Sequence, residues 1–347
     1  MTIRKTNRTW RYRSRWLTAS LCLAAFLSWS TSVFAQDDTA IRPNHGGQAE
    51  EITITVGVLD IVNIDNKTQV FEVDLFVEIR WLDPRLAADG AEVSEYRTFS
   101  LGDIWTPRLV IVNDRGLDSL LPEVATVDRQ GNVVLRQRVA GPLAVDLDLR
   151  EFPLDTQRLR IDVVSYQYSP DELVFSDQSS MVARLDELSG GGWVFAAVDP
   201  EMSVFRLRQN AAGVSQVTFS VMAERQASYY LITLALPMTL ILFLAWMVQW
   251  LPPDIVPARM GMASATVFSL IALGVSFRLT MPDITYLTSA DRFVLYSTLL
   301  VIASLAVTVA SVRLANQEKM DAAQKLTRRA RWAFPVVYLG ILLVLAI

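Results

Sequence analysis

Thiol and imidazole side chains are almost missing from this sequence, which has one cysteine and one histidine among 347 residues. Cys22 stands in an N-terminal apolar segment, so the rest of the chain has no thiol for a disulfide or a thiolate metal site. His45 is alone in a stretch of proline, asparagine and glycine, which argues against a serine–histidine triad and a histidine metal site. Since no glycine-rich phosphate loop or nucleophile–base pair stands out either, we expect no enzymatic activity, no cofactor and no metal.

Charge is missing from four long segments toward the C-terminus. No Asp, Glu, Lys or Arg occurs in residues 226–253, 260–277, 293–312 and 332–347, which form uncharged runs of 28, 18, 20 and 16 residues. A hydrocarbon core of about 30 Å is crossed by about 20 helical residues. We therefore predict four transmembrane helices, at about 229–251, 258–279, 289–313 and 330–347, of which the last has the shortest uncharged run.

The first 35 residues have basic side chains but no acidic one. Six Lys and Arg residues precede an apolar stretch at 17–29, and Ser-Val-Phe-Ala follows at 32–35. This order predicts a cleavable signal peptide over residues 1–35 and export of the domain after it. The alternative, an uncleaved membrane anchor, is disfavoured because the apolar stretch is shorter than a membrane span.

Acidic and basic residues divide unevenly along the rest of the chain. Residues 36–228 contain 17 Lys and Arg against 31 Asp and Glu, whereas residues 229–347 contain nine against five. The acidity of the first part argues against nucleic acid as a partner. The loops at 252–259 and 313–331 hold seven of the nine basic residues, so the positive-inside rule places these loops in the cytoplasm and both ends of the mature chain outside it.

Residues 51–224 alternate apolar and polar side chains in short runs, such as 52–56 and 73–79, and turn residues separate the runs, as at 129–132. Alternation with a period of two is typical of β-strands that bury one face. We predict an all-β sandwich over residues 36–228, followed by a four-helix transmembrane bundle over residues 229–347.

Recognisable motifs occur at strand ends, in one long loop and at the beginnings of two spans. They are Trp-Leu-Asp-Pro-Arg-Leu at 81–86, Trp-Thr-Pro-Arg-Leu at 105–109, Phe-Pro-Leu-Asp-Thr-Gln at 152–157, Glu-Arg-Gln at 224–226 and Pro-Ala-Arg at 257–259. Together they resemble the pentameric ligand-gated ion channels, the Cys-loop receptor superfamily, and the membrane motifs are most similar to those of glycine receptors. Val145 and Leu159 stand where that superfamily has its two loop cysteines, as in its prokaryotic members. The resemblance therefore implies a protein of a bacterial inner membrane.

The resemblance covers about residues 51–347 and implies a homopentamer around a central pore, which sits in lipid, conducts a small ion and opens on binding a small molecule or a proton. Its ligand site would lie between neighbouring sandwiches, at Phe76, Glu78, Arg136, Arg138, Tyr166, Tyr168 and Phe205. Its coupling residues would be Asp65, Lys67, Asp148, Phe152, Pro153, Arg225, Arg278, Pro282 and Tyr286, with Asn66 in the first of these loops. Glu78 and Val164 depart from the glycine-receptor pattern, which argues against glycine as the agonist.

The second span mixes small and hydroxyl-bearing residues, which makes it the candidate pore lining. The family register would put Gly261, Ala265, Phe268, Ala272 and Val275 on the pore axis, with Phe268 as a hydrophobic constriction. Helical periodicity alone prefers another face, on which Arg259, Thr266, Ser269 and Ser276 recur at intervals of seven, three and seven residues. We prefer the family register, because the flanks on both sides align without a gap.

The cytoplasmic mouth of that span has a basic residue. Pro257, Ala258 and Arg259 resemble the anion-selective branch of the superfamily, whose cation-selective relatives usually have a glutamate there. Five arginines and five helix N-termini would favour anions, so we predict chloride selectivity. Alternatively, Arg259 anchors the helix at the cytoplasmic face and points away from the pore.

Two alternatives to a ligand-gated anion channel stay open. The first is a cation-selective or proton-gated channel of the same fold, in which carboxylates such as Glu78, Asp148 or Glu224 would need raised pKa values. The second is a non-conducting periplasmic sensor with a membrane anchor.

Overall fold

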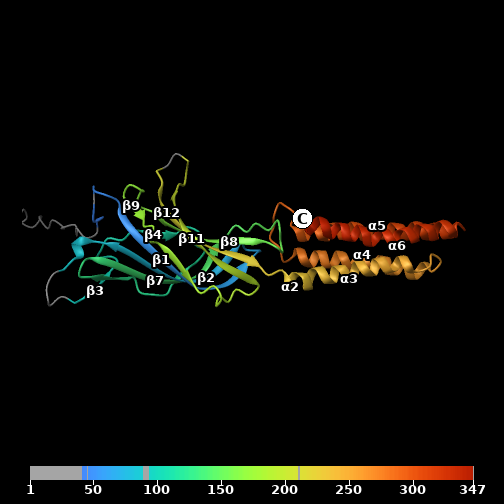
Figure 1. Ribbon diagram of the computed structural model, residues 1–347, viewed down its shortest axis with the longest axis horizontal. Helices are drawn as coiled ribbons and strands as arrows, with labels where there is room; N and C mark the ends of the chain where they lie inside the picture. Colours follow the sequence, from blue (N-terminus) through green and yellow to red (C-terminus); the bar gives the residue numbers. More distant parts are fainter. Residues whose placement is uncertain (1–40, 45, 89–93, 210–211, 347) are drawn as a thin grey trace, which may run out of the picture.

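The computed structural model describes residues 41–44, 46–88, 94–209 and 212–346. The predicted signal peptide at 1–35, Cys22 and His45 lie outside the described residues. Within them a β-rich domain and a bundle of helices follow one another along a single long axis (Figure 1). This division agrees with the fold predicted from the sequence.

Two packed sheets form the β-rich domain. The larger sheet has the strand order β10-β1-β2-β7-β6-β3, with β5 beside β7 and β9 beside β1, and the smaller has the order β11-β12-β8-β4. The strands of the larger sheet are β1 (Glu50–Asp65), β2 (Val70–Leu82), β3 (Tyr96–Ser100), β5 (Asp118–Ser119), β6 (Val124–Asp128), β7 (Asn132–Ala144), β9 (Leu173–Phe175) and β10 (Ser180–Ala183). Those of the smaller sheet are β4 (Leu109–Ile111), β8 (Thr156–Ser165), β11 (Trp193–Phe205) and β12 (Val214–Arg225).

The core of the sandwich follows from the alternation in the sequence. In β1 every second residue points inward, and Ile52, Ile54 and Val56 are fully buried. Phe219 and Leu159 from the smaller sheet are equally buried against them in the same apolar cluster. Burial of a large aliphatic or aromatic side chain contributes about 1.5–3 kcal/mol, so this cluster holds the two sheets face to face.

Four helical segments make up the second domain. The first consists of α2 (Ser228–Tyr230), η3 (Leu231–Ala235), α3 (Leu236–Met247) and η4 (Val248–Trp250), and the others are α4 (Val256–Arg278), α5 (Ser289–Asn316) and α6 (Met320–Ala346). Among the described residues three segments are long and apolar enough to cross a membrane, namely Ser228–Trp250, Val256–Arg278 and Ser289–Asn316. α6 begins before residue 330, where the fourth span is predicted, and its first turns carry charge, so the fourth span stays a prediction.

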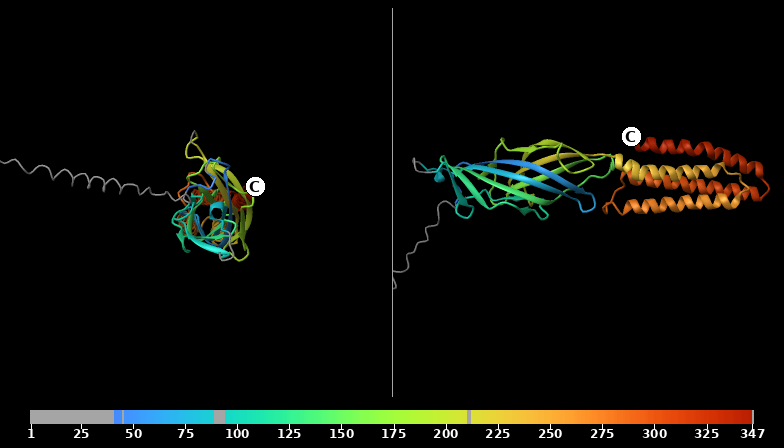
Figure 2. Two further views of the ribbon diagram at one scale, coloured as in Figure 1. Left: turned by 90° about the vertical axis from the view of Figure 1, so that its left-hand side faces the viewer. Right: turned by 90° about the horizontal axis from the view of Figure 1, so that it is seen from below.

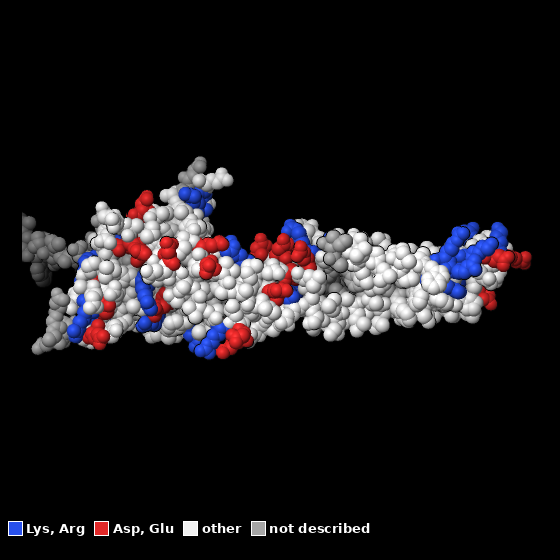
Figure 3. Space-filling view, viewed as in Figure 1, with Lys and Arg blue, Asp and Glu red and all other residues white. Residues whose placement is uncertain are grey.

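The helices run side by side, and α5 packs against both α4 and α6 (Figure 2). An uncharged surface band separates the charged β-rich domain from a group of Lys and Arg side chains at the far end of the bundle (Figure 3). Inside that far end, the Gln249 amide donates to Ser304 Oγ (2.9 Å) and Thr308 Oγ1 (3.1 Å). The bundle therefore has a polar interior at the end that lies away from the β-rich domain.

Candidate functional site

The best-defined polar site lies where the β-rich domain meets the helices, and it is built around Arg225. β12 and β8 pair antiparallel with Glu224 opposite Thr156, so the residues at the sheet end, Arg225 and Asp155, face each other. The Arg225 guanidinium donates to both Asp155 carboxylate oxygens, at 2.8 and 3.1 Å. Both side chains are almost fully buried, at 4% and 2% exposure, and such a two-pronged pair fixes geometry as well as charge.

Other loops complete the surroundings of Arg225. Its Nη2 also donates to Asn66 Oδ1 at 2.9 Å, which ties the β1–β2 turn to the end of β12. Its guanidinium carbon lies 4.0 Å from the ring centre of Trp193, 4.8 Å from that of Phe152 and 5.7 Å from that of Tyr230. Arg225 therefore connects strand ends, the segment 145–159 and the first helical segment through cation–π and hydrogen-bond contacts. Segment 145–159, called the 145–159 loop below, consists of the loop after β7 and the first residues of β8.

The 145–159 loop reaches into the helical domain with Phe152. This side chain is fully buried, and its ring centre lies 4.7 Å from that of Tyr230 and 6.1 Å from that of Phe277 on α4. The peptide bond between Phe152 and Pro153 is cis. The loop thus contacts both the first segment and α4, the predicted pore helix.

The same loop also caps α5. The backbone N–H groups of Ser289 and Ala290, in the first turn of α5, donate to the carbonyl oxygens of Arg150 (2.9 Å) and Phe152 (3.1 Å). N–H groups in the first turn of a helix lack intrahelical partners, so these bonds join the two domains directly. The Tyr286 hydroxyl accepts from the Leu149 N–H at 3.0 Å, and the Arg150 guanidinium covers the Tyr286 ring at 4.7 Å.

The remaining predicted coupling residues lie around this junction without contacting Arg225. Asp65 accepts hydrogen bonds from Thr68 and the Lys67 N–H within its own turn, while the Lys67 side chain is exposed. Arg278 pairs with Asp291 at 2.8 Å on the surface, and Pro282 is half-buried. Sequence reasoning did not assign a role to Asp155, although this residue is the fourth of the Phe-Pro-Leu-Asp-Thr-Gln motif.

Two predicted coupling carboxylates are held in their ionised form. Hydrogen bonds from the backbone N–H and guanidinium of Arg150 lower the pKa of Asp148. A hydrogen bond from the Thr68 hydroxyl lowers the pKa of Asp65. For Asp148 this is opposite to the raised pKa that a proton sensor near neutral pH would need.

The five residues of the predicted pore register share one side of α4. Gly261, Ala265, Phe268, Ala272 and Val275 are all exposed, and Phe268 is 71% exposed. The competing polar face is divided, because Ser269 and Ser276 are exposed whereas Thr266 and Arg259 are buried in the bundle. Pro257 and Ala258, the other residues of the predicted selectivity motif, are exposed.

The predicted ligand residues of the larger sheet form cross-strand ion pairs. Glu78 on β2 accepts from Arg136 on β7 at 2.7 Å and also contacts Arg80. Arg138 donates to both carboxylate oxygens of Asp74, at 3.0 and 2.6 Å. Phe76 stands between Asp74 and Glu78 on the same face of β2 and is half-buried. The charges of both arginines are therefore matched within the sheet.

Of the remaining predicted aromatic ligand residues, Tyr166 and Tyr168 lie on the loop after β8, and Phe205 ends β11. Tyr166 is 57% exposed, and Phe205, at the end of β11, is half-buried. Tyr168 accepts a hydrogen bond from Trp105 Nε1 at 2.7 Å, and Trp105 in turn packs edge-on against Trp81. Trp81 and Trp105 belong to the motifs at 81–86 and 105–109. Residues of these two motifs therefore fix the position of Tyr168.

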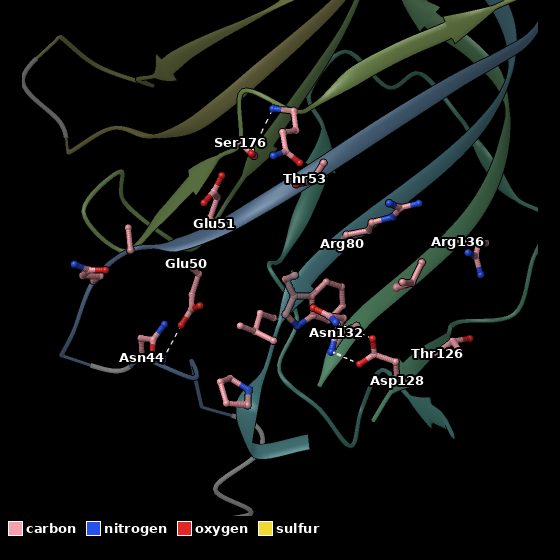
Figure 4. Close-up of a pocket in the computed structure, with 18 of the residues that line it drawn as sticks. Asn44, Glu50, Glu51, Thr53, Arg80, Thr126, Asp128, Asn132, Arg136 and Ser176 are labelled. Carbon is pink, nitrogen blue, oxygen red and sulfur yellow. Dashed lines mark hydrogen bonds between the residues drawn. The ribbon is translucent and has the colours of Figure 1, made fainter. Parts of the chain in front are cut away.

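A wide groove of about 1130 Å³ was not predicted from the sequence. It is lined by Glu51 and Thr53 from β1, Arg80 from β2 and Arg136 from β7, and Asp128 closes one side (Figure 4). Its walls combine β1, β2 and β7, so the groove depends on the strand order of the sheet, although Trp81, Leu82 and Pro84 of the motif at 81–86 also line it. Among the described residues no group of three or more His, Cys, Asp or Glu is placed to hold a metal ion.

Comparison with protein families agrees with this architecture in both domains. Residues 29–226 match the neurotransmitter-gated ion-channel ligand binding domain. Residues 234–336 match the neurotransmitter-gated ion-channel transmembrane region. The two matches meet close to Arg225, where the structure joins the domains.

Proposed function

We propose that this chain, which belongs to the neurotransmitter-gated ion-channel family, forms a homopentameric, anion-selective channel of a bacterial inner membrane. Membership makes it a pentameric ligand-gated ion channel with an extracellular N-terminal domain, and not an enzyme. The identity of the subunits, the permeant ion and the membrane are the proposed parts. The observation that carries the pore assignment is the exposed apolar side of α4.

Phe268 is the strongest support for this pore. Phe268 is 71% exposed on α4, between the exposed residues Gly261 and Ala265 on one side and Ala272 on the other, and such an apolar side needs a cover in the assembled protein. In a pentamer with α4 at the centre, five copies of Phe268 cover one another around the axis. A ring of apolar side chains that narrows a water-filled path closes it by dewetting.

Anion selectivity is supported by the composition of α4. The helix contains no acidic residue, and its N-terminus, with the exposed residues Pro257 and Ala258, opens toward the cytoplasm. Five such N-termini attract anions. Arg259 is buried behind this face, so it acts through its electric field and not by contact with the ion.

A cation-selective channel is the second candidate. Asp254 is exposed in the loop before α4, and five copies of it would stand at the cytoplasmic mouth. The acidic domain over residues 36–228 also attracts cations, although surface charge is screened beyond about 8 Å at physiological salt.

Gating would begin at the interface between neighbouring β-rich domains. Tyr166, Tyr168 and Phe205 of one subunit would face Phe76 and the paired charges of the next. Since Glu78 and Asp74 pair with Arg136 and Arg138, this surface offers aromatic rings beside charges that are already paired. A small organic cation is the class of agonist that suits it, through cation–π attraction.

A recording of the purified full chain in planar bilayers, scanned over small amines and over pH, tests this function. In asymmetric NaCl we expect ligand-dependent current that reverses near the chloride potential. Reversal near the sodium potential would replace the anion channel by the cation channel. Absence of any ligand- or pH-dependent flux from liposomes that contain assembled pentamers would favour the non-conducting sensor.

A further inference from the structure

Arg259 has no partner in spite of complete burial. It lies in the first turn of α4, at the cytoplasmic end of the bundle, and its exposed fraction is 0%. Nε, Nη1 and Nη2 are all buried and make no hydrogen bond to the described residues. A guanidinium withdrawn from water without hydrogen bonds or an opposite charge costs several kcal/mol. The folded bundle therefore lacks something that this side chain requires.

The surroundings of Arg259 add positive charge and supply no carboxylate. Arg331 on α6 lies at the same end of the bundle as Arg259 and carries the same charge. Arg331 Nε donates to the Gln249 carbonyl oxygen at 2.8 Å, and its guanidinium covers the Trp250 ring at 4.8 Å, so Arg331 is fixed in this position. Gln249 Oε1 is also buried without a donor, but one neutral amide oxygen cannot neutralise two guanidinium groups. The missing component is an anion.

We propose that Arg259 and Arg331 bind a phosphate group between the cytoplasmic ends of the helices of each subunit. Each guanidinium has a planar fork of N–H donors that suits phosphate oxygens, and the N-terminus of α4 adds its positive end. Arg331 is half-buried, so it connects the buried Arg259 to the surface of the bundle. The phosphate belongs either to the head group of an inner-leaflet lipid or to a free phosphate ion.

The position of this site at the membrane surface suits a phosphate from either source. Lys325, Arg328 and Arg329 are exposed on the first half of α6, as Arg331 is partly exposed there. Trp250 precedes Arg259 in the chain, and Trp332 directly follows Arg331. Both tryptophans are exposed, as expected for side chains at the level of lipid head groups. Basic pockets between membrane helices on the cytoplasmic side are known to take anionic head groups. This phosphate site is distinct from the ion pore, and its occupancy can be measured without recording current.

The experiment measures thermal unfolding of the full-chain pentamer in nanodiscs. Wild-type protein and Arg259→Gln are compared in phosphatidylcholine alone, in phosphatidylcholine with phosphatidylglycerol, and in phosphatidylcholine with added inorganic phosphate. Arg328→Gln is the matched control, because it removes a charge of the same sign from the exposed surface of the same end. Arg331→Gln is the second variant if Arg259→Gln does not assemble.

We expect the order of Tm between wild type and Arg259→Gln to invert when a phosphate group is supplied. In phosphatidylcholine alone Arg259→Gln unfolds at a higher temperature than wild type, because an unpaired buried charge is gone. Phosphatidylglycerol, or inorganic phosphate, raises the Tm of wild type and of Arg328→Gln, and its apparent affinity is at least about tenfold weaker for Arg259→Gln and Arg331→Gln. A response to phosphatidylglycerol alone assigns the lipid head group, and an equal response to inorganic phosphate assigns the free ion. If the Tm of wild type responds to neither, or Arg259→Gln responds as wild type does, the proposal is wrong.

Discussion

The two ends of the helical domain each bury an arginine, and the two differ in every contact. Arg225, at the extracellular end, has a buried carboxylate, an amide oxygen and three aromatic rings around it. Arg259, at the cytoplasmic end, has no hydrogen bond to the described residues and shares this end of the bundle with Arg331. The buried arginine at the extracellular end has its full set of partners within one chain, whereas the one at the cytoplasmic end has no hydrogen bond to the described residues.

The difference shows that burial of a charge does not by itself define its role. A buried cation with a full set of partners connects the elements that supply them, as Arg225 connects four segments of the domain junction. A buried cation without partners indicates a component from outside the chain. Substitutions at the two ends should therefore have opposite consequences in the absence of ligands.

The largest effect on current and stability is expected from substitution of Arg225, at the extracellular end. Arg225→Ala leaves the Asp155 carboxyl, which is 2% exposed, without its guanidinium partner, at a cost of about 3–5 kcal/mol. We expect loss of ligand-activated current together with a strong decrease in Tm, measured on protein that still elutes as a pentamer.

The double variant Arg225→Ala with Asp155→Ala separates the pair from its surroundings. Removal of both charges should restore part of the stability lost in Arg225→Ala, because no unpaired charge is left. Arg184→Ala is the control, since it breaks an ion pair with Glu187 that is exposed on both sides and contributes about 0–1 kcal/mol. Unchanged current in Arg225→Ala would remove this residue from coupling.

The next effect concerns the pore face of α4. Phe268→Ala removes the proposed apolar constriction, so we expect a several-fold increase in current without ligand. Phe243→Ala is the control, because Phe243 is a comparably exposed phenylalanine on α3. Equal unstimulated currents in Phe268→Ala and wild type would contradict Phe268 as the closed constriction.

The sequence predicts the sandwich and the helices because both depend on local patterns. Alternation in β1 and uncharged runs of membrane length remain visible without any tertiary information. The rotation of α4 about its axis is different, because small and hydroxyl-bearing residues occur on all its sides. The periodicity of the polar residues and the preferred family register therefore indicate different faces, and only packing against α3 and α5 places Arg259 and Thr266 inside the bundle.

Asp155 illustrates the other limit of sequence reasoning. Its motif marks the loop as important, but the partner Arg225 is 70 residues away in the chain. The pair forms because β8 and β12 are neighbours in the smaller sheet and in one particular register. Sheet order and register are long-range properties, so the contact could not be read from either motif alone.

A smaller effect is expected from the hydroxyl that joins the 145–159 loop to the loop before α5. Tyr286→Phe keeps the ring under Arg150 but leaves the Leu149 N–H without its acceptor, at a cost of about 0.5–1.5 kcal/mol. We expect a higher concentration of agonist for half-maximal current with normal assembly. An unchanged concentration–response curve would restrict Tyr286 to packing through its ring.

The smallest effect is expected from pH at the same junction. The N–H and guanidinium of Arg150 lower the pKa of Asp148, so the hydrogen bonds it accepts are present at pH values above the ordinary aspartate range near 3.9 and are lost only as the pH falls through the lowered pKa. Asp148 therefore stays ionised between about pH 5 and 8. Asp148→Asn should leave the pH for half-maximal activation of any proton-dependent current unchanged, measured beside Asp65→Asn as a second ionised carboxylate of the junction. A shift confined to Asp148→Asn would mean that this group takes up a proton during gating, and the paired, ionised state in this structure would then belong to one end of the gating transition only.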